Sequence, residues 1–348
     1  VDGFYEQWAA RQAATAVRLA WRSRGEARLS TASGRLAGHT FNRTREGGPI
    51  DPVLTTLRVD RPDGSPLAMV VNFQAHPTVH TPLRPFDVTR DVPGGACDLL
   101  EAALPGATAM YLQGACGDVN FLRHYSTPQR CHEPARLVAG RALSCQAEAV
   151  EIDTPRLASV SERVRIPTRR WTKEEIDADR DEAQRRLRDR DATGWRETIG
   201  RVMTNRPDDM VRRHGGDEWK AVEAMCRFHL AWTYEMLKDW EHRPESLETE
   251  VQALRIGPLG IVANSSEFFS SLALDVRGRS DCEHLMIACY ANGRIGYVPD
   301  AHDVAAKSYA AYQSPKYCNQ FPFTTGSGPV MCEAMVNVLD RSRETASG

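Results

Sequence analysis

Three stretches decide the fold: Met69-Val70-Val71-Asn72-Phe73-Gln74-Ala75-His76-Pro77-Thr78-Val79-His80, then Arg90-Asp91-Val92-Pro93-Gly94, then Met110-Tyr111-Leu112-Gln113-Gly114-Ala115-Cys116-Gly117-Asp118-Val119-Asn120. The first and third begin as apolar runs, which are typical of buried strands. One run ends in an imidazole before a proline, and the other ends in a glycine-rich turn that carries a carboxylate. Functional side chains commonly lie where a strand gives way to a loop, because the sheet fixes their position. We therefore expect the two strand ends to form one site.

Composition excludes several classes of function. The chain has 348 residues, enough for one large domain or two, and a formal net charge of −2 with 26% charged residues. This balance gives no basic surface for nucleic acid. The arginine-rich run at 185–190 alternates with acids, which predicts a solvated helix face. No apolar run has the length of a membrane span.

Nine cysteines are present, and no two of them form a CxxC pair. An odd number cannot all pair within one chain, and the spacing fits neither a zinc knuckle nor a disulfide framework. Buried free thiols are the expected state, and they favour a reducing compartment. We therefore expect a cytoplasmic location, although a chain that begins at Val1 leaves room for a preceding signal or N-terminal segment.

Hydrophobic periodicity predicts an α/β fold with a mixed β-sheet core and outer helices. Expected helices cover residues 4–24, 94–104, 133–150 and 330–339. Expected strands cover residues 160–166, 248–256, 259–263 and 285–290, and a hairpin joins 54–59 to 67–75. The charged segment 172–245 opens with Thr172-Lys173-Glu174-Glu175, a capping-box pattern, and predicts a helical insertion without a catalytic group.

The quoted motifs resemble the catalytic domain of the neutral/alkaline, non-lysosomal ceramidases and their bacterial relatives. That family has a strand ending in His-Pro, an Asp-x-Pro-Gly segment, and an apolar strand leading into Gly-Asp-Val. The combination is far more specific than any one motif. The resemblance covers nearly the whole chain and implies one ceramidase-like domain over residues 1–348. It also implies that the family's first portion lies outside this chain.

The resemblance implies a zinc site. Ceramidases hold zinc with two histidines, a glutamate and a tyrosine. The His-Pro histidine corresponds to His76, the "Glu-Phe" glutamate to Glu267, and the "Gly-Tyr-Val" tyrosine to Tyr297. Taken alone, each residue has an ordinary structural interpretation. Tyr309 matches a further tyrosine of the family pattern, and the Asn42-Arg43 pair matches one near the family's pocket.

This chain departs from the family pattern at two points. The second zinc histidine of the family belongs to a His-Thr-His segment that precedes the helix expected at 4–24. A separate N-terminal segment, another chain, His39 or His80 is expected to replace it. Ceramidases also have a serine after Gly-Asp-Val, where this chain has Asn120. Asparagine is no nucleophile, but it can hydrogen-bond a carbonyl or an oxyanion.

The resemblance therefore predicts a zinc-dependent hydrolase that cleaves an amide through a metal-activated water. Asp118, Asp91 or His80 would take the proton or orient the ligands, and Asn120 would assist the oxyanion. The substitution of serine by Asn120 points to a small polar amide rather than ceramide.

Arg43 and Arg90 would suit a carboxylate on such a substrate, because a guanidinium pairs with a carboxylate in bidentate fashion. Three alternatives remain. The chain could be a true N-acyl-sphingosine amidohydrolase, a non-catalytic binding relative without metal, or a serine hydrolase using Ser265 or Ser266. The serine hydrolase is disfavoured, since neither serine lies in a G-x-S-x-G elbow. Oligomer formation stays open.

Overall fold

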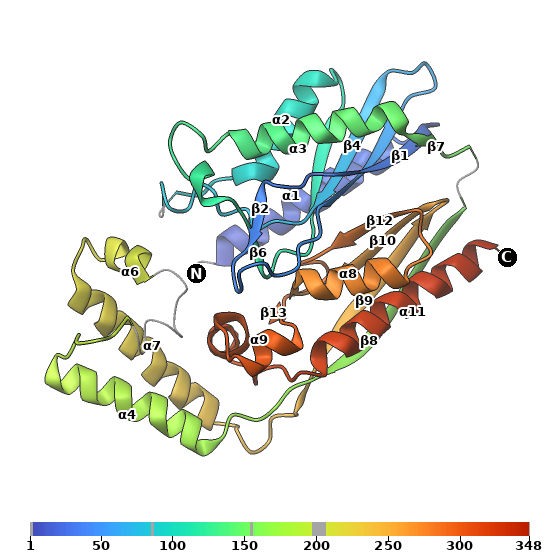
Figure 1. Cartoon of the computed structure of the whole chain (residues 1–348). Helices are drawn as coiled ribbons and strands as arrows, with labels where there is room; N and C mark the ends of the chain where they lie inside the picture. Colours follow the sequence, from blue (N-terminus) through green and yellow to red (C-terminus); the bar gives the residue numbers. More distant parts are fainter. Residues whose placement is uncertain (1–2, 85–86, 154–155, 197–206, 348) are drawn as a thin grey trace.

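The computed structural model describes residues 3–84, 87–153, 156–196 and 207–347. Two sheets lie face to face at its centre, and helices cover the outer side of each sheet (Figure 1). The predicted α/β class with a mixed sheet core and outer helices is confirmed.

The first sheet contains the two strands that sequence analysis placed beside the site. Its strand order is β5 (Thr108–Gln113), β4 (Pro66–Phe73), β3 (Val53–Asp60), β1 (Arg28–Arg35) and β7 (Val150–Glu151). Strands β4 and β5 are parallel, and α2 (Asp91–Ala103) connects them, whereas β3 and β4 form the predicted hairpin. Helices α2 and α3 (Glu133–Cys145) pack on this sheet and bury Val92, Leu100 and Val138.

The second sheet repeats this arrangement. Its strand order is β12 (His284–Ala288), β10 (Leu259–Asn264), β9 (Ser246–Ile256) and β8 (Leu157–Pro167). Strands β10 and β12 are parallel and are connected by α8 (Ser270–Arg279), which packs with α11 (Ser327–Ser347) on the outer face. Each sheet thus contains one strand–helix–strand unit. In such units, ligand-binding groups gather beyond the carboxyl ends of the parallel strands.

Contacts between the sheets bring those carboxyl ends together. Leu57, Ile152, Leu259 and Met286 form an apolar layer between the sheets. Asn72 of β4 donates to the carbonyl oxygen of Ile287 in β12 over 2.9 Å and accepts from its N–H over 3.1 Å. Buried polar groups need such partners, so this pair fixes how the sheets align.

Two short ladders extend from these strand ends toward the candidate site. Strand β2 (Thr40–Asn42) pairs with β6 (Val119–Phe121), and β11 (Glu267–Phe268) pairs with β13 (Tyr297–Val298). The second ladder is parallel and sets Glu267 opposite Tyr297. An isolated bridge joins His76 to Asn120.

Helices occupy the segment 172–245, where we expected an insertion. They are α4 (Lys173–Asp189), α6 (Pro207–Arg213) and α7 (Glu218–Leu237), and residues 197–206 lie outside the described residues. The predicted capping box at Thr172 and Glu175 is present. In Figure 1 these helices project from the layered body.

The insertion is held to the body by a buried lysine. Lys316, on α10 (Ser314–Tyr317), forms an ion pair with Asp179 of α4. The ammonium group of Lys316 also lies 4.9 Å from the ring centre of Trp232 and 4.5 Å from that of Tyr312. Aromatic faces attract a cation, and a desolvated cation more strongly.

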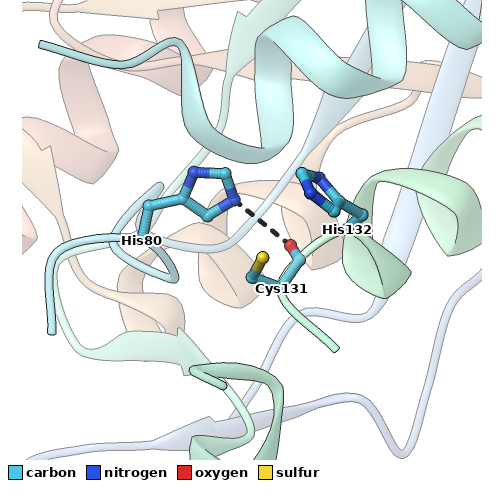
Figure 2. A group of neighbouring side chains, drawn as sticks. All are labelled: His80, Cys131 and His132. Carbon is cyan, nitrogen blue, oxygen red and sulfur yellow. Dashed lines mark hydrogen bonds between the residues drawn. The ribbon is translucent and has the colours of Figure 1, made fainter. Parts of the chain in front are cut away.

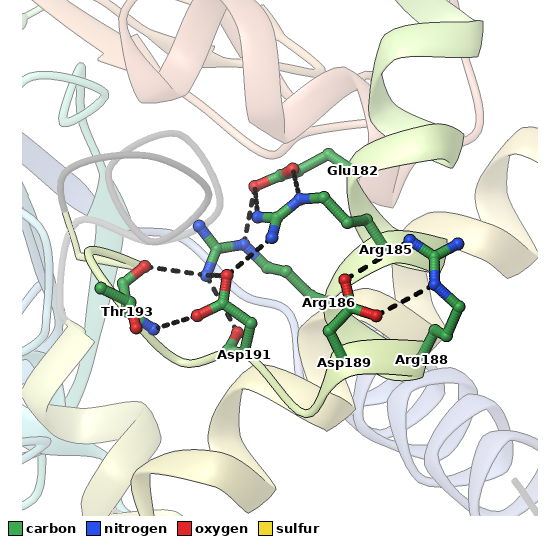
Figure 3. A network of polar contacts seen from close by, with 7 residues as sticks. All are labelled: Glu182, Arg185, Arg186, Arg188, Asp189, Asp191 and Thr193. Atoms are coloured by element: carbon green, nitrogen blue, oxygen red, sulfur yellow. Dashed lines mark hydrogen bonds and ion pairs between the residues drawn. The ribbon is translucent and has the colours of Figure 1, made fainter.

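The arginine-rich run at the C-terminal end of α4 is not a uniformly solvated face, so that prediction is wrong for one residue. Arg186 has only 3% of its side chain exposed and pairs with Glu182 over 2.7 Å. Its Nη1 donates to the carbonyl oxygens of Asp191 and Thr193 over 3.0 and 3.1 Å, as Figure 3 shows. Arg186 therefore closes the turn that ends the helix, whereas Arg188 stays exposed.

Several element boundaries differ from expectation. Helix α2 begins at Asp91 rather than at residue 94, and α3 ends at Cys145, before the short helix η2 (Gln146–Glu148). The remaining short helices are η1 (Arg123–Tyr125), α9 (Ala301–Ala305) and η3 (Tyr309–Gln313). Helix α1 (Gly3–Arg22) forms as predicted, yet it contains no buried residue.

The cysteines and the hydropathy of the helices were also considered in the sequence. All nine cysteines are free thiols, and six of them are buried, as the sequence predicted. Across the described residues, every helix is too short or too polar to span a membrane.

Candidate metal centre and active site

His76 lies where β4 gives way to a loop, and both of its ring nitrogens are engaged. Its Nδ1 hydrogen-bonds to the carbonyl oxygen of Cys116, which can only accept. Nδ1 therefore carries a proton, and Nε2 is directed at a carboxylate oxygen of Glu267, 2.9 Å away. A histidine oriented in this way, with one nitrogen on a carbonyl, is the usual arrangement of a metal ligand.

Glu267 and Tyr297 complete the predicted set around Nε2 of His76. The Tyr297 hydroxyl lies 3.4 Å from that nitrogen, and the two rings stack with centres 6.0 Å apart. Burial raises the pKa of Glu267, but hydrogen bonds from His76 and from the tyrosine hydroxyls outweigh it and lower that pKa. The carboxylate is therefore ionised at neutral pH, as a metal ligand must be.

The environment of His76 favours a positive charge. Burial and Arg43 act to lower the pKa of His76, but Cys116 and Glu267 outweigh them and raise it to about 9. The Glu267 carboxylate, 2.9 Å from Nε2, supplies a negative potential at that nitrogen. The same potential favours a bound cation.

Arg43 connects the tyrosine to the glycine-rich turn. Its guanidinium donates to the Tyr297 hydroxyl over 3.0 Å and to the carbonyl oxygen of Gly117 over 2.8 Å. Burial raises the pKa of Tyr297, whereas the charge of Arg43 acts to lower it. Arg43 thus favours the phenolate form that a metal requires of a tyrosine ligand.

Gly117 is required by a close approach of two backbones. A Cβ atom at this position would lie 2.5 Å from the carbonyl oxygen of Glu267 and 2.6 Å from the ring of Phe269. The N–H of Gly117 donates to the carbonyl oxygen of Phe268 over 2.9 Å. The glycine therefore allows the end of β5 to lie directly against β11, which carries Glu267.

Asp118 is fully buried, and both of its carboxylate oxygens are occupied. One accepts from the backbone N–H of Ser270 over 2.8 Å, and the other from the amide of Asn42 over 2.7 Å. Its backbone carbonyl accepts from the N–H of Arg43 over 2.7 Å. Burial raises the pKa of Asp118 to about 6, although these hydrogen bonds oppose the shift. Through these contacts, Asp118 holds Asn42 and Arg43 in place.

Asn120 carries a buried polar atom without a partner. Within the described residues, its side-chain oxygen accepts no hydrogen bond, and the residue is only 9% exposed. Leaving such an atom unsatisfied costs about 1–3 kcal/mol. Because Asn120 forms a ladder pair with His76, the two side chains project from the same face. A ligand bound at His76 would lie beside this free acceptor.

Tyr290 belongs to the cluster, and sequence analysis missed it. Its hydroxyl lies 3.5 Å from Nε2 of His76 and 3.4 Å from the sulfur of Cys116. The backbone of Tyr290 is left-handed, with φ 57°, a conformation that persists in a non-glycine residue only when the surroundings impose it. The available signal was its place directly after a strong apolar run, the rule that located His76.

Other predicted residues lie away from this cluster. Asp91 accepts from the backbone N–H groups of Val79 and His80, which fixes the loop before α2. The side chain of Arg90 is exposed and pairs with Asp98 over 2.6 Å. His39 bonds to the hydroxyl of Tyr125 over 2.7 Å, which gives its Nδ1 a structural partner.

His80 is engaged elsewhere as well. Its ring nitrogens contact Thr89 and the carbonyl oxygen of Cys131, both over 3.4 Å, rather than the His76 cluster. Tyr309 lies at the cluster's edge, with its ring centre 6.1 Å from that of Tyr297.

Ser265 and Ser266 are unsuited to nucleophilic catalysis. The hydroxyl of Ser265 bonds to that of Thr249, and the hydroxyl of Ser266 donates to Asn264 over 2.6 Å. Both serines are buried, and neither hydrogen-bonds a histidine among these contacts. A nucleophilic serine needs an adjacent base, so the serine hydrolase alternative gains no support.

Comparison with known proteins identifies the fold. No protein-family model matches the chain, and a search of curated proteins finds no match either. Among solved structures, the neutral ceramidase of Pseudomonas aeruginosa is similar, with a TM-score of 0.60 and 17% identity over 92% of this chain and 53% of that chain. This chain has the ceramidase fold.

A second ceramidase structure, described as complexed with C2, gives the same result, with a TM-score of 0.58 and 16% identity. The alignment covers 91% of this chain and 54% of that ceramidase, so the chain spans about half the length of both ceramidases. Identity at this level establishes the ceramidase fold. Function depends on the residues of the site itself, because one fold supports many activities.

Proposed function

We propose that the chain is a zinc-dependent hydrolase that cleaves an amide bond in a small polar substrate. The observation that carries the proposal is the position of Nε2 of His76. This nitrogen faces the carboxylate of Glu267 at 2.9 Å and the hydroxyl of Tyr297 at 3.4 Å, while Nδ1 is held by a carbonyl. Nitrogen and oxygen donors of these types are ligands that zinc accepts.

His76, Glu267 and Tyr297 would hold the metal. When bound, zinc would polarise the scissile carbonyl and acidify a water molecule. Arg43 would oppose the rise in the pKa of Tyr297 that burial causes and so favour its ionisation on the metal, and the carbonyl of Cys116 would keep the proton of His76 on Nδ1. Asp118 would act through Asn42 and Arg43 as a positioning residue, since its oxygens are already occupied.

A fourth ligand has two candidate sources. Tyr290 already has its hydroxyl 3.5 Å from Nε2 of His76. Alternatively, a histidine from a separate N-terminal segment or another chain would complete the site, as the resemblance implies. The two sources are distinguishable, because Tyr290→Phe weakens zinc binding by this chain only in the first case.

Asn120 favours an amide as the substrate. A secondary amide offers both a carbonyl oxygen and an N–H, and the Asn120 side chain offers a donor and a free acceptor. Asn120 would donate to the carbonyl as negative charge develops there and accept from the amide N–H. Arg43 is committed to Tyr297 and Gly117, so any carboxylate on the substrate would have to share this guanidinium.

The experiment combines metal analysis with an assay. We expect one zinc in the His76 cluster and hydrolysis of short N-acyl amides, with no turnover of ceramide. His76→Ala should abolish activity, Asn120→Ala should reduce it, and Arg188→Ala, on the exposed face of α4, should leave it unchanged. Efficient ceramide hydrolysis would identify a true N-acyl-sphingosine amidohydrolase. Purified protein that binds no zinc at this cluster would identify a non-catalytic relative.

A further inference from the structure

A second group of potential metal ligands lies outside the candidate active site. It consists of His80, Cys131 and His132, whose ligand atoms all lie within 4.8 Å of one another. Figure 2 shows the three side chains around one space between the loop after β4 and the start of α3. Nothing in the proposed hydrolysis uses Cys131 or His132.

The three side chains have the chemistry of a zinc site. One thiolate and two imidazoles are borderline-soft donors that zinc prefers, and carboxylate-preferring ions such as Mg²⁺ are disfavoured. In tetrahedral zinc sites, sulfur and nitrogen ligands lie about 3.5 Å apart, as bond lengths near 2.0–2.3 Å require. The ligand atoms of these three residues are at most 4.8 Å apart. Rotation of the exposed His132 side chain would bring its ring nitrogen to coordination distance.

The ligand atoms of these residues are engaged only in long contacts. Nδ1 of His80 lies 3.4 Å from the hydroxyl of Thr89, and Nε2 lies 3.4 Å from the backbone carbonyl oxygen of Cys131, a contact that a metal ion would replace. Cys131 is 8% exposed, and its thiol donates a weak hydrogen bond to the carbonyl oxygen of Pro128 over 3.6 Å. His132 precedes α3 at the N-cap position, yet its side chain makes no capping hydrogen bond.

We propose that His80, Cys131 and His132 bind one zinc ion at a site distinct from the His76 cluster. Binding replaces the thiol proton of Cys131, which is released to solvent, and the two imidazoles coordinate as neutral ligands. Water occupies the fourth position on the side exposed by His132. This proposal does not rest on the proposed hydrolase function.

The position of the site suggests its effect. His80 lies four residues after His76, and Asp91 at the start of α2 already holds the backbone of His80 over 2.8 Å. A metal shared with Cys131 and His132 ties this loop to the start of α3. The zinc therefore restrains the segment that leaves the candidate active site.

Cobalt substitution provides a direct test. Co²⁺ bound by a thiolate shows a charge-transfer absorption in the near ultraviolet, and the His76 cluster contains no cysteine among its expected ligands. The full chain titrated with Co²⁺ should develop this band to the intensity of one thiolate-bound cobalt ion per chain, and added Zn²⁺ should remove it. Cys131→Ser should abolish the band. The matched control Cys116→Ser, which removes a buried thiol beside the His76 cluster, should retain it.

His132→Ala keeps the test decisive if Cys131→Ser fails to fold, since His132 is exposed. It should weaken cobalt affinity at this site by at least about a hundredfold, because loss of a direct ligand costs more than the tenfold to hundredfold lost with a residue that only orients a ligand. The double variant His76→Ala/Glu267→Gln should still show the thiolate band, which separates this proposal from the proposed function. A full chain without the band, or a band that survives Cys131→Ser or is unaffected by His132→Ala, would overturn the proposal.

Discussion

Arg43 donates a hydrogen bond from Nη2 to the hydroxyl oxygen of Tyr297 over 3.0 Å, and the same guanidinium lies 5.5 Å from the centre of that ring. The two residues come from opposite ends of the chain, from the loop after β2 and from β13. Because Arg43 also bonds to Gly117, it joins the turn after β5 to the ladder that carries Glu267. One arginine thus fixes the position of the tyrosine and acts to lower its pKa.

Arg43→Met is predicted to weaken zinc binding. Without the guanidinium, burial and Glu267 both raise the pKa of the Tyr297 hydroxyl unopposed, so the phenolate becomes harder to form. We expect a loss of zinc affinity of about tenfold to a hundredfold, as for other groups that orient a metal ligand. Competition with a chromophoric chelator measures it. Arg90→Met, which removes an exposed arginine paired with Asp98, is the control, and equal affinities in the two variants would contradict the role of Arg43.

Gly117→Ala should disrupt the site without a change in charge. Its Cβ would lie 2.5 Å from the carbonyl oxygen of Glu267, so the two backbones must separate. We expect a loss of zinc binding and activity. Gly140→Ala, on the exposed side of α3 with open space around its Cβ, should instead raise stability by about 0.5–1 kcal/mol. Activity assays and denaturant unfolding of both variants check this, and a fully active Gly117→Ala enzyme would be inconsistent with the close approach.

Much of the site could be predicted because its residues follow apolar strands. His76 and Glu267 come directly after β4 and β10, whose carboxyl ends converge in the folded chain. Tyr290 follows β12 in the same way. It was missed because a tyrosine after an apolar run has the pattern of a core residue, and only its contacts with His76 reveal the difference.

Side-chain contacts were harder to predict from the sequence where they depend on the conformation of a turn. His80 lies only four residues from His76, so the two histidines were assigned to one site. The loop after Pro77 instead directs His80 toward Cys131. We expected Arg186 to be solvated because its neighbours are charged. Its side chain is buried instead, and the carbonyl groups that accept its hydrogen bonds belong to the turn after α4. Neither arrangement follows from periodicity.

Arg186→Ala should destabilise the protein far more than Arg188→Ala. Removal of Arg186 leaves the carbonyl groups of Asp191 and Thr193 without this donor in a buried setting. We expect a loss of about 3 kcal/mol, typical of breaking a buried charged contact. Arg188 is exposed and, within the part of the chain that the structure describes, pairs with the adjacent Asp189, so its loss should cost less than about 0.5 kcal/mol. Urea unfolding of both variants measures the difference, and equal costs would refute the structural role of Arg186.

Asp118 should make the protein less stable as pH rises from about 4 to about 6. Burial raises the pKa of its carboxyl to about 6 in the folded chain, above the ordinary value of 3.8. Between these two values the folded state binds more protons than the unfolded state, so the free energy of unfolding falls as pH rises. The contribution is fully present below the unfolded pKa and is lost above the folded one. Over this range it amounts to about 3 kcal/mol.

Asp118→Asn removes the titrating group, so its stability profile should lose this fall between pH 4 and pH 6. The variant should also be less stable at low pH, because its amide would face the donor of Asn42. Asp63→Asn serves as the control. Hydrogen bonds from Ser65 lower the pKa of that exposed carboxyl, so its contribution has the opposite sign. Denaturant unfolding at a series of pH values would detect the change, and an unaltered slope in Asp118→Asn would show that Asp118 stays ionised throughout.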